Sequence, residues 1–244
     1  MIKRNYYKIV RVFPDPSSYF YIKNETMNQG EFQFNSSWLP TVNLEYSFDK
    51  VNWRRVNGGF NVPADSYVYF RNNTGTFCPN EETNSIYIYQ NISLGGDVRT
   101  LFNYTDVDSV TAIPAHGFRY PFGFFDNGKC IDISNLSFRG ITSIGDYGIS
   151  GAFNQPQFTI TKGVDLRDVT TLGVGALQEL YAYNSNLTEA YAPNVSTWDE
   201  SKTNGWLSSV SSTGVVYKPS TLTIPTDDDS GIPYGWTTQD YPTK

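Results

Sequence analysis

The one histidine of the chain is the first residue to consider for catalysis. His116 follows Ile113, Pro114 and Ala115 in a stretch that predicts a turn. A hydrolytic triad needs such a base beside a Ser or Cys nucleophile, and no nucleophile-bearing turn stands near it in the sequence. Cys78 and Cys130 lie far apart without a metal or redox spacing, so we predict two unpaired thiols. The sequence thus predicts no catalytic residue, no metal and no cofactor.

Acidic residues offer two further chemistries. A glycosidase needs two carboxylates about 5–10 Å apart, and the candidate pairs are Asp106/Asp108 and Asp132/Asp165. The aspartates at 227–229 have the right oxygen ligands for calcium but lack the EF-hand spacing and its final glutamate. We interpret that run as a solvated loop and the pairs as polar positions on a protein surface. A carbohydrate-active enzyme stays a third hypothesis, which predicts glycan turnover by the purified protein.

The composition favours β-structure with polar surfaces. Charged residues make up 17% of the 244, and 18 Tyr and 16 Phe supply strand-forming side chains. The net charge of −6 leaves no basic cluster for phosphates, so we expect no nucleic-acid partner. No run approaches the roughly 20 apolar residues of a membrane span, and we expect no membrane insertion. The basic start of the chain has no apolar core behind it, so we also expect no secretory leader.

Short β-prone runs bounded by turn residues fill the first 96 residues. The runs cover residues 6–13, 19–22, 31–34, 42–46, 51–56, 66–71 and 85–89. The run 51–56 returns after a turn at 47–50, which predicts a hairpin with 42–46. Strands at this spacing predict a small antiparallel β-sandwich or barrel over residues 1–96, and we favour the sandwich.

Two phrases then recur about thirty residues apart. The phrase at 110–113 (VTAI) returns at 141–144 (ITSI) and 169–172 (VTTL). The second phrase stands at 131–133, 164–166 and 190–192. Chance matches in β-rich sequence are the alternative, but two phrases in the same order favour a stacked repeat. We predict a short, degenerate leucine-rich-repeat solenoid over 97–197, with a helical turn at 175–181 and a β-type cap over 198–244.

Strand alternation assigns the second phrase a binding face. It points Ile131/Ile133, Val164/Leu166 and Ala190/Ala192 inward, as one apolar column. Asp132, Asp165 and Tyr191 then point outward on the concave strand face, and we predict that they form the contact surface.

The aromatic residues between positions 118 and 125 form a second feature with two readings. They either plug the junction between the two units, which we favour, or form an exposed platform for a glycan or a protein chain.

Three parts of the sequence resemble surface and virion proteins of Bacteroidetes and their phages. The segments LEYSFDKVNW (44–53) and VYFR (68–71) resemble the module that precedes leucine-rich repeats in those proteins. The segments ITSIGDYGISGAF (141–153) and LTEAYAP (187–193) are similar to the BspA-like repeat. The segments GVVYK (214–218) and GIPYGWT (231–237) resemble the ending of the same proteins. Residues 154–156 (NQP) stand where the family often has a Cys-bearing turn, which leaves the number of repeats open.

The resemblance implies a binding protein and not an enzyme. Members are cell-surface adhesins with leaders, or components of phages, including crAss-like phages. Because no leader is expected, we predict a phage structural protein on the virion: a head- or tail-fibre or receptor-binding component. Its expected partners are other virion proteins and a host surface glycan or protein, and we expect a homo-oligomer. The alternative is an exported bacterial BspA-like adhesin at the cell surface.

Overall fold

The computed structural model of the chain describes residues 19–35, 42–77, 86–125 and 127–242. These residues are mainly β, as the composition predicts: four sheets hold the strands, while α1 (Thr100–Asn103) and α2 (Glu200–Thr203) have four residues each. A 3-10 helix, η3, covers Val107–Ser109. Within the same residues no helix has the length and apolar character that a membrane crossing requires.

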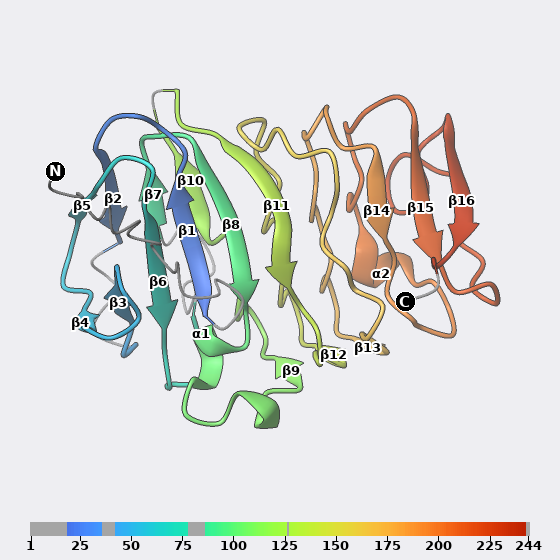
Figure 1. Cartoon of the computed structure of the whole chain (residues 1–244). Helices are drawn as coiled ribbons and strands as arrows, with labels where there is room; N and C mark the ends of the chain where they lie inside the picture. The colour runs from blue at the N-terminus through green and yellow to red at the C-terminus, as the bar shows by residue number, and fades with distance from the viewer. Residues whose placement is uncertain (1–18, 36–41, 78–85, 126, 243–244) are drawn as a thin grey trace, which may run out of the picture.

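The largest sheet has six strands in the order β11-β8-β1-β6-β3-β4. They are β1 (Phe20–Asn24), β3 (Glu45–Ser47), β4 (Arg54–Arg55), β6 (Tyr67–Arg71), β8 (Ile92–Asp97) and β11 (Cys130–Ser137). All neighbours in it run antiparallel except β8 and β11, which are parallel. The predicted boundary at residue 96 lies inside β8, and the sheet continues across it into β11 (Figure 1).

A second sheet lies against the first and closes the N-terminal core. It has the order β10-β7-β2-β5, from β2 (Gly30–Phe34), β5 (Phe60–Val62), β7 (Ile86–Ile88) and β10 (Phe122–Phe124). Phe34 of β2 meets Phe70 of β6 across the two sheets, with ring centroids 6.1 Å apart. Alternation buries Phe20 and Ile22 of β1 in the same core.

The predicted strands of this part that the structure describes are found, whereas β5 and β8 were not predicted. The hairpin expected over 42–56 is shorter, because β3 and β4 pair only through Glu45–Arg55 and Tyr46–Arg54. The run at 6–13 lies outside the described residues, as does Cys78.

The predicted alignment of the first recurring phrase is confirmed. The strands β9 (Ala112–Ile113), β12 (Ser143–Ile144) and β13 (Thr171–Leu172) form a parallel sheet. Ser143 pairs with Ala112 on one side and with Thr171 on the other. We call each of the successive chain segments that carry these strands a coil. The last apolar residue of each phrase, Ile113, Ile144 or Leu172, is buried, so equivalent residues of successive coils stack in one core.

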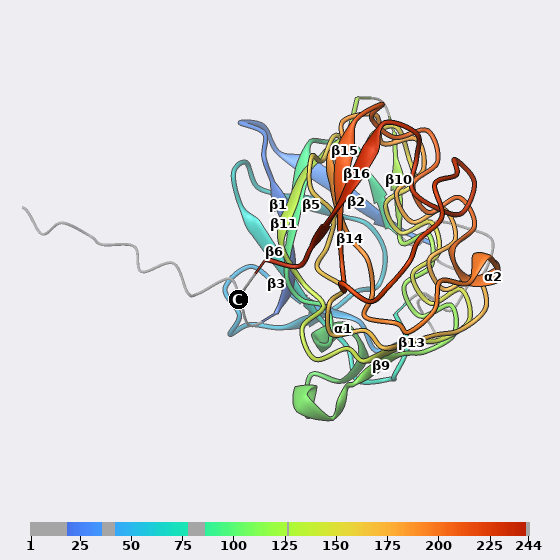
Figure 2. The ribbon, with the colours of Figure 1, turned by 90° about the vertical axis from the view of Figure 1, so that its right-hand side faces the viewer.

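A second set of parallel strands, the fourth sheet, forms another wall of the coils. It contains β14 (Glu189–Tyr191), β15 (Gly214–Lys218) and β16 (Trp236–Asp240). Single bridges connect it back to β11, from Cys130 to Phe158 and from Lys162 to Glu189. Figure 1 shows the resulting row of strands from β6 to β16. Figure 2, a view from the C-terminal end of this row, shows α2 on the other side of the coils from β14–β16.

The register of the second phrase differs from the prediction. Cys130 pairs with Phe158. Asp132 lies two residues after Cys130, whereas Asp165 lies seven residues after Phe158, so the two aspartates are not side by side in the register. Register shifts on either side of Asp132 in β11 also break the alternation. As a result Ile131, predicted to point inward, is 43% exposed, while Ile133 is buried. Ile133, Leu166 and Ala192 nevertheless belong to one continuous core.

The prediction of a helical turn at 175–181 is wrong. These residues form successive turns, with Gly175 and Glu179 at positive φ. The N–H groups of Leu177, Glu179 and Tyr181 donate to the next coil, at the carbonyls of Lys202, Asn204 and Trp206. A helix would use those groups within itself. The i, i+3, i+4 apolar pattern arises here from a turn that repeats every four residues.

Phe118 joins the N-terminal core to the coils. Its ring centroid lies 5.6 Å from that of Phe77 and 6.3 Å from that of Phe20 in the first core, and 6.5 Å from that of Phe153 in a following coil. Phe118, Phe122 and Phe124 are buried, whereas Phe125 is 46% exposed. Phe118, Phe122 and Phe124 therefore fill the interior, as the favoured interpretation of the aromatic segment predicts.

We predict that Phe118→Ala destabilises the whole chain by about 3–5 kcal/mol, because it leaves a cavity where the two parts meet. Denaturant unfolding measures the change, with Phe125→Ala as the control that costs less than about 1 kcal/mol at its exposed site. Equal losses for both variants would contradict the junction role of Phe118.

Candidate binding face

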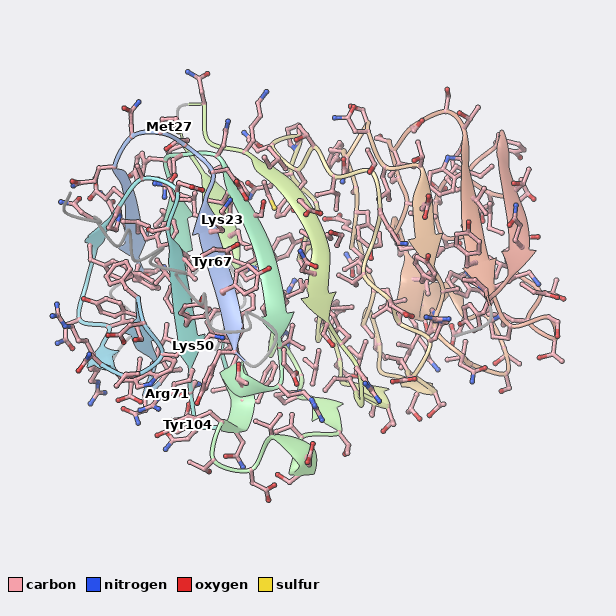
Figure 3. All side chains as sticks on the ribbon, viewed as in Figure 1. Lys23, Met27, Lys50, Tyr67, Arg71 and Tyr104 are labelled. Carbon is pink, nitrogen blue, oxygen red and sulfur yellow. The ribbon has the colours of Figure 1, made fainter. Side chains whose placement is uncertain are left out.

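The side chains best placed for binding stand on one side of the row of strands. We call it the outer face: the side of β6, β1, β8, β11, β14 and β15 that points away from the core. Alternation builds it, because Phe20 and Ile22 point inward from β1 while Tyr21 and Lys23 point the other way. Figure 3 shows this face toward the viewer, with Lys23, Lys50 and Tyr67 on it.

A tyrosine cluster covers β1 and β6 on the outer face. The rings of Tyr67 and Tyr69 stack at 6.0 Å, and Tyr21 meets the edge of Tyr67 at 5.2 Å. The ammonium groups of Lys23 and Lys50 lie over the rings of Tyr67 and Tyr69, at 5.8 Å and 4.7 Å. Cation–π contacts of this kind hold both the charges and the rings in place.

Tyr21 is, with Tyr69, one of the two most enclosed members of the tyrosine cluster. Its ring lies across Gly95 of β8, where any side chain would collide with it. Only 4% of its surface is exposed. Burial, helped by the neighbouring Tyr67 and the carboxylate of Asp132, raises the pKa of Tyr21 to about 12. The hydroxyl of Tyr21 is therefore neutral over the physiological pH range.

Arg71 continues the cluster toward the end of β6. Its guanidinium lies between the rings of Trp53 and Tyr104, at 4.1 Å and 4.2 Å from their centroids. The Nε atom also donates to Oε2 of Glu45 at 2.7 Å. An arginine held by two rings and a carboxylate has few rotamers left to lose when a partner binds.

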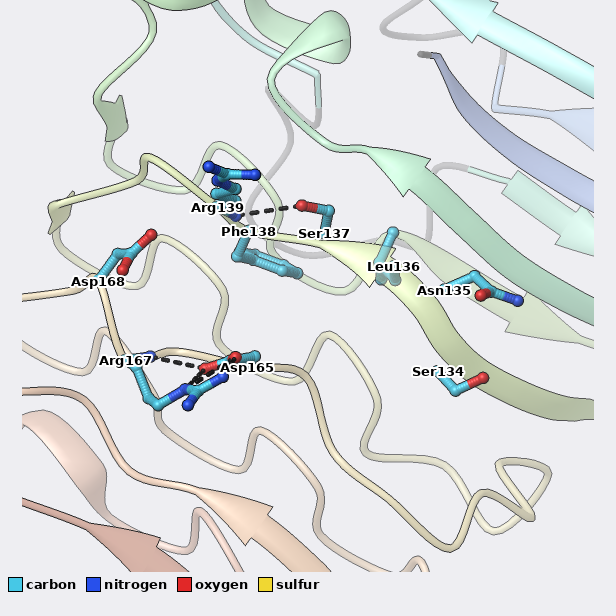
Figure 4. A pocket seen from close by; sticks show the side chains of 9 residues that line it. All are labelled: Ser134, Asn135, Leu136, Ser137, Phe138, Arg139, Asp165, Arg167 and Asp168. Carbon is cyan, nitrogen blue, oxygen red and sulfur yellow. Dashed lines mark hydrogen bonds and ion pairs between the residues drawn. The ribbon is translucent and has the colours of Figure 1, made fainter. Parts of the chain in front are cut away.

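A groove lies further along the outer face, between β11 and residues 165–168. Its volume is about 420 Å³, and Figure 4 shows the side chains that line it. Those side chains are Ser134, Asn135, Leu136, Ser137, Phe138, Arg139, Asp165, Arg167 and Asp168. The lining thus combines the apolar side chains of Leu136 and Phe138 with polar groups and with charges of both signs.

The Arg167 side chain in the groove is held in place by several partners. Its guanidinium donates to both carboxylate oxygens of Asp165, with Nε–Oδ1 at 2.9 Å and Nη2–Oδ2 at 2.6 Å. The Nη1 atom donates to the carbonyl of Pro242 at 3.0 Å. Its guanidinium also lies 5.8 Å from the ring centroids of both Tyr191 and Tyr241. The hydrogen bond with Asp165 raises the pKa of Arg167, and burial raises that of Tyr241.

The structure separates the three predicted contact residues. Asp165 lines the groove, and Asp132 does not. The Asp132 side chain instead accepts from the N–H and the hydroxyl of Ser134, at 2.8 and 3.0 Å, inside the irregular part of β11. Tyr191 stands on the outer side of β14, stacked on Tyr217 at 4.9 Å.

Tyr191 points outward as predicted, but its ring is almost fully covered. Only 5% of its surface is accessible, because Lys162, at 5.2 Å, and Arg167 cover the ring. The hydrogen bond to Tyr191 also raises the pKa of Lys162. Tyr191 thus supports the groove from below instead of offering a contact surface.

The remaining sequence candidates have local roles. His116, at φ 58°, stacks on Tyr147 at 5.5 Å in the turns between coils. Asp108 is exposed and pairs with Arg99 at 3.4 Å. Asp227 accepts the N–H of Asp229 at 2.7 Å, and this backbone bond lowers its pKa. In the described part of the chain no group of His, Cys, Asp and Glu has a metal-binding arrangement.

Cys130 is buried and has no disulfide partner in the described ranges. Burial raises the pKa of its thiol, so the thiolate is disfavoured.

The groove and the tyrosine cluster were missed by sequence reasoning, although signals for both exist. Asp165 and Arg167 are two residues apart, the spacing of neighbours on one side of a strand. Tyr67, Tyr69 and Arg71 have the same spacing in β6. The alternation of these polar and aromatic residues with buried Val68 and Phe70 marks an outer face. Nothing in one coil indicates which residues of the next coil lie beside it.

Comparisons with known proteins give no relative: no family model, no curated protein and no solved structure matches the chain. The chemistry of the outer face must therefore carry the functional argument. Aromatic rings, paired guanidinium and carboxylate groups and amides can bind the apolar and hydroxylated faces of a sugar or the side chains of another protein.

We predict that Tyr21 makes the fold sensitive to alkali. A raised folded pKa means that its contribution is complete below the unfolded value near 10 and is lost as the pH rises toward 12. Tyr21→Phe removes this loss, so between pH 8 and pH 11 it should gain roughly 1 kcal/mol of unfolding free energy relative to the wild type.

Urea unfolding at the two pH values tests this, with Tyr234→Phe in the exposed last coil as the control. An identical pH dependence for Tyr21→Phe and the wild type would show that the Tyr21 hydroxyl is not enclosed.

Proposed function

We propose that the chain is a phage virion structural protein, a fibre or receptor-binding component, that works by binding through its outer face. The observation that carries the proposal is the groove with its fixed arginine. Arg167 is held by Asp165, by the Pro242 carbonyl and by two tyrosine rings before any partner arrives. Preorganised groups of this kind suit recognition, since little side-chain entropy is lost on binding.

The architecture that we infer for this role has three parts. The two facing sheets of the first part act as a β-sandwich. The parallel strands β9, β12 and β13 and the wall β14–β16 act as a short leucine-rich-repeat-like solenoid, with the segment after residue 198 as its cap. The aligned copies of the first phrase support this reading, because repeat proteins bury a core only by stacking.

The outer face suits an extended partner. The tyrosine cluster, Arg71 and the groove lie along one row of strands, and the side chains in each are paired by ion pairs or ring contacts. A neighbouring virion chain or a host surface glycan would meet aromatic and planar polar groups along this row. The resemblance of residues 141–153 and 214–237 to BspA-like proteins of Bacteroidetes and their phages supports the same role.

Particle association tests the virion assignment. We expect mass spectrometry of gradient-purified phage particles to find the protein at a fixed copy number. Its recovery from the bacterial cell surface, and not from particles, would instead favour the exported adhesin.

A paired substitution tests the outer face itself. Asp132→Ala with Asp165→Ala should reduce incorporation into particles or adsorption to host cells by about tenfold, equivalent to 1.4 kcal/mol, through release of Arg167. Both carboxylates are partly accessible, so the melting temperature should stay close to that of the wild type.

The control is Asp106→Ala with Asp108→Ala, which removes two exposed aspartates around η3 and should leave both readouts unchanged. Normal assembly and adsorption of the Asp132/Asp165 variant would remove this part of the outer face from the binding surface.

A further inference from the structure

The last strand of the row has an open edge. β16 pairs with β15 on one side and has no strand partner on the other among the described residues. The N–H of Tyr241 donates to the carbonyl of Lys218 in β15, so the backbone groups of Tyr241 point toward β15. Because backbone groups alternate along a strand, those of Thr238 and Asp240 point to the open side. An unpaired edge is a template for another strand.

The last coil, which carries this edge, is acidic. The last coil, residues 219–240, contains four aspartates and neither lysine nor arginine. Asp240 and the three other side chains of β16 that follow Trp236 are exposed. Asp228 and Asp229 are also exposed, in the turn of the same coil where Asp229 and Ser230 contact the segment around α2. Tyr234, just before the strand, is 67% exposed. A strand that fits here is basic and carries some apolar side chains.

The chain itself contains such a segment. Residues 1–18, outside the described ranges, carry Lys3, Arg4, Lys8 and Arg11 against one acid, Asp15. Residues 6–13 (YYKIVRVF) are the β-prone run of the sequence analysis, and Pro14 ends it. We propose that residues 6–13 of one copy add as a strand to the open edge of β16 in a second copy.

Chain length favours a second copy over the same one. Seven strand spacings separate β1 from a strand beyond β16, through β8, β11, residues 158–162, β14 and β15. That is about 34 Å at the usual spacing. The link from residue 13 to residue 19 spans only about 20 Å when fully extended.

Pairing therefore runs from one molecule to the next. Each copy gives one strand and accepts one, so the contact is head-to-tail and builds rings or filaments. This inference goes beyond the proposed function and does not depend on it.

The test uses the full chain and the molar mass from light scattering over a wide range of concentrations. The wild type should form assemblies larger than a monomer that weaken with salt, because opposite charges meet at the contact. Thr238→Pro should stay folded, since proline is tolerated where the N–H faces outward from an edge strand, and it should be monomeric. The matched control Thr238→Val keeps the N–H and should assemble.

A second variant breaks the donor instead. The double variant Ile9→Pro with Val10→Pro removes two adjacent N–H groups. One of the two must face the partner strand, so this variant should also be monomeric. A mixture of Thr238→Pro with the double proline variant should give a one-to-one dimer, because one chain keeps the donor and the other keeps the edge. A monomeric wild type, assembly of Thr238→Pro like the wild type, or a mixture that stays monomeric would each overturn the proposal.

Discussion

The structure depends on one constraint: the backbone of each coil must find its hydrogen-bond partners in the next coil. The segment 147–153 is the clearest case. The N–H groups at its alternate positions donate to the carbonyls of Val174, Ala176, Gln178 and Leu180. The coil after it repeats the arrangement with residues 202–208. Since a buried N–H without an acceptor is costly, each coil is fixed in register by its neighbour.

The same constraint explains the glycines and aromatic rings of the turns. Tyr120 lies over Gly151, and Tyr147 over Gly175, at positions where a side chain would collide with the ring. Both glycines have positive φ, which the repeating turn requires. The offsets match those of the parallel strands β9, β12 and β13, so turns and strands keep one common register. A row of strands built in this way presents a stiff outer face, on which Arg167 and the tyrosine cluster are positioned by neighbours far away in sequence.

The parts of this fold that depend on local pattern could be predicted, and those that depend on neighbouring coils could not. The strands at β1, β2, β6 and β7 and the alignment of the first phrase follow from apolar periodicity. The turns at 175–181 resemble a helix in sequence because a four-residue turn repeat and a helical turn space apolar residues alike. Ile131 became exposed because register shifts in β11 change which side a residue faces. Tyr191 is covered by side chains of the preceding coil, a contact without a local signal.

Amide hydrogen exchange, followed residue by residue by NMR, tests the central constraint most directly. The amides of Tyr147, Ile149, Gly151 and Phe153 lie in turns, yet each donates to the following coil. If the coils are held by these bonds, the four amides should exchange slowly and with similar free energies, close to that of global unfolding. Fast exchange, at the rates of an exposed loop, would contradict the account, because the turns would then not be joined to the next coil.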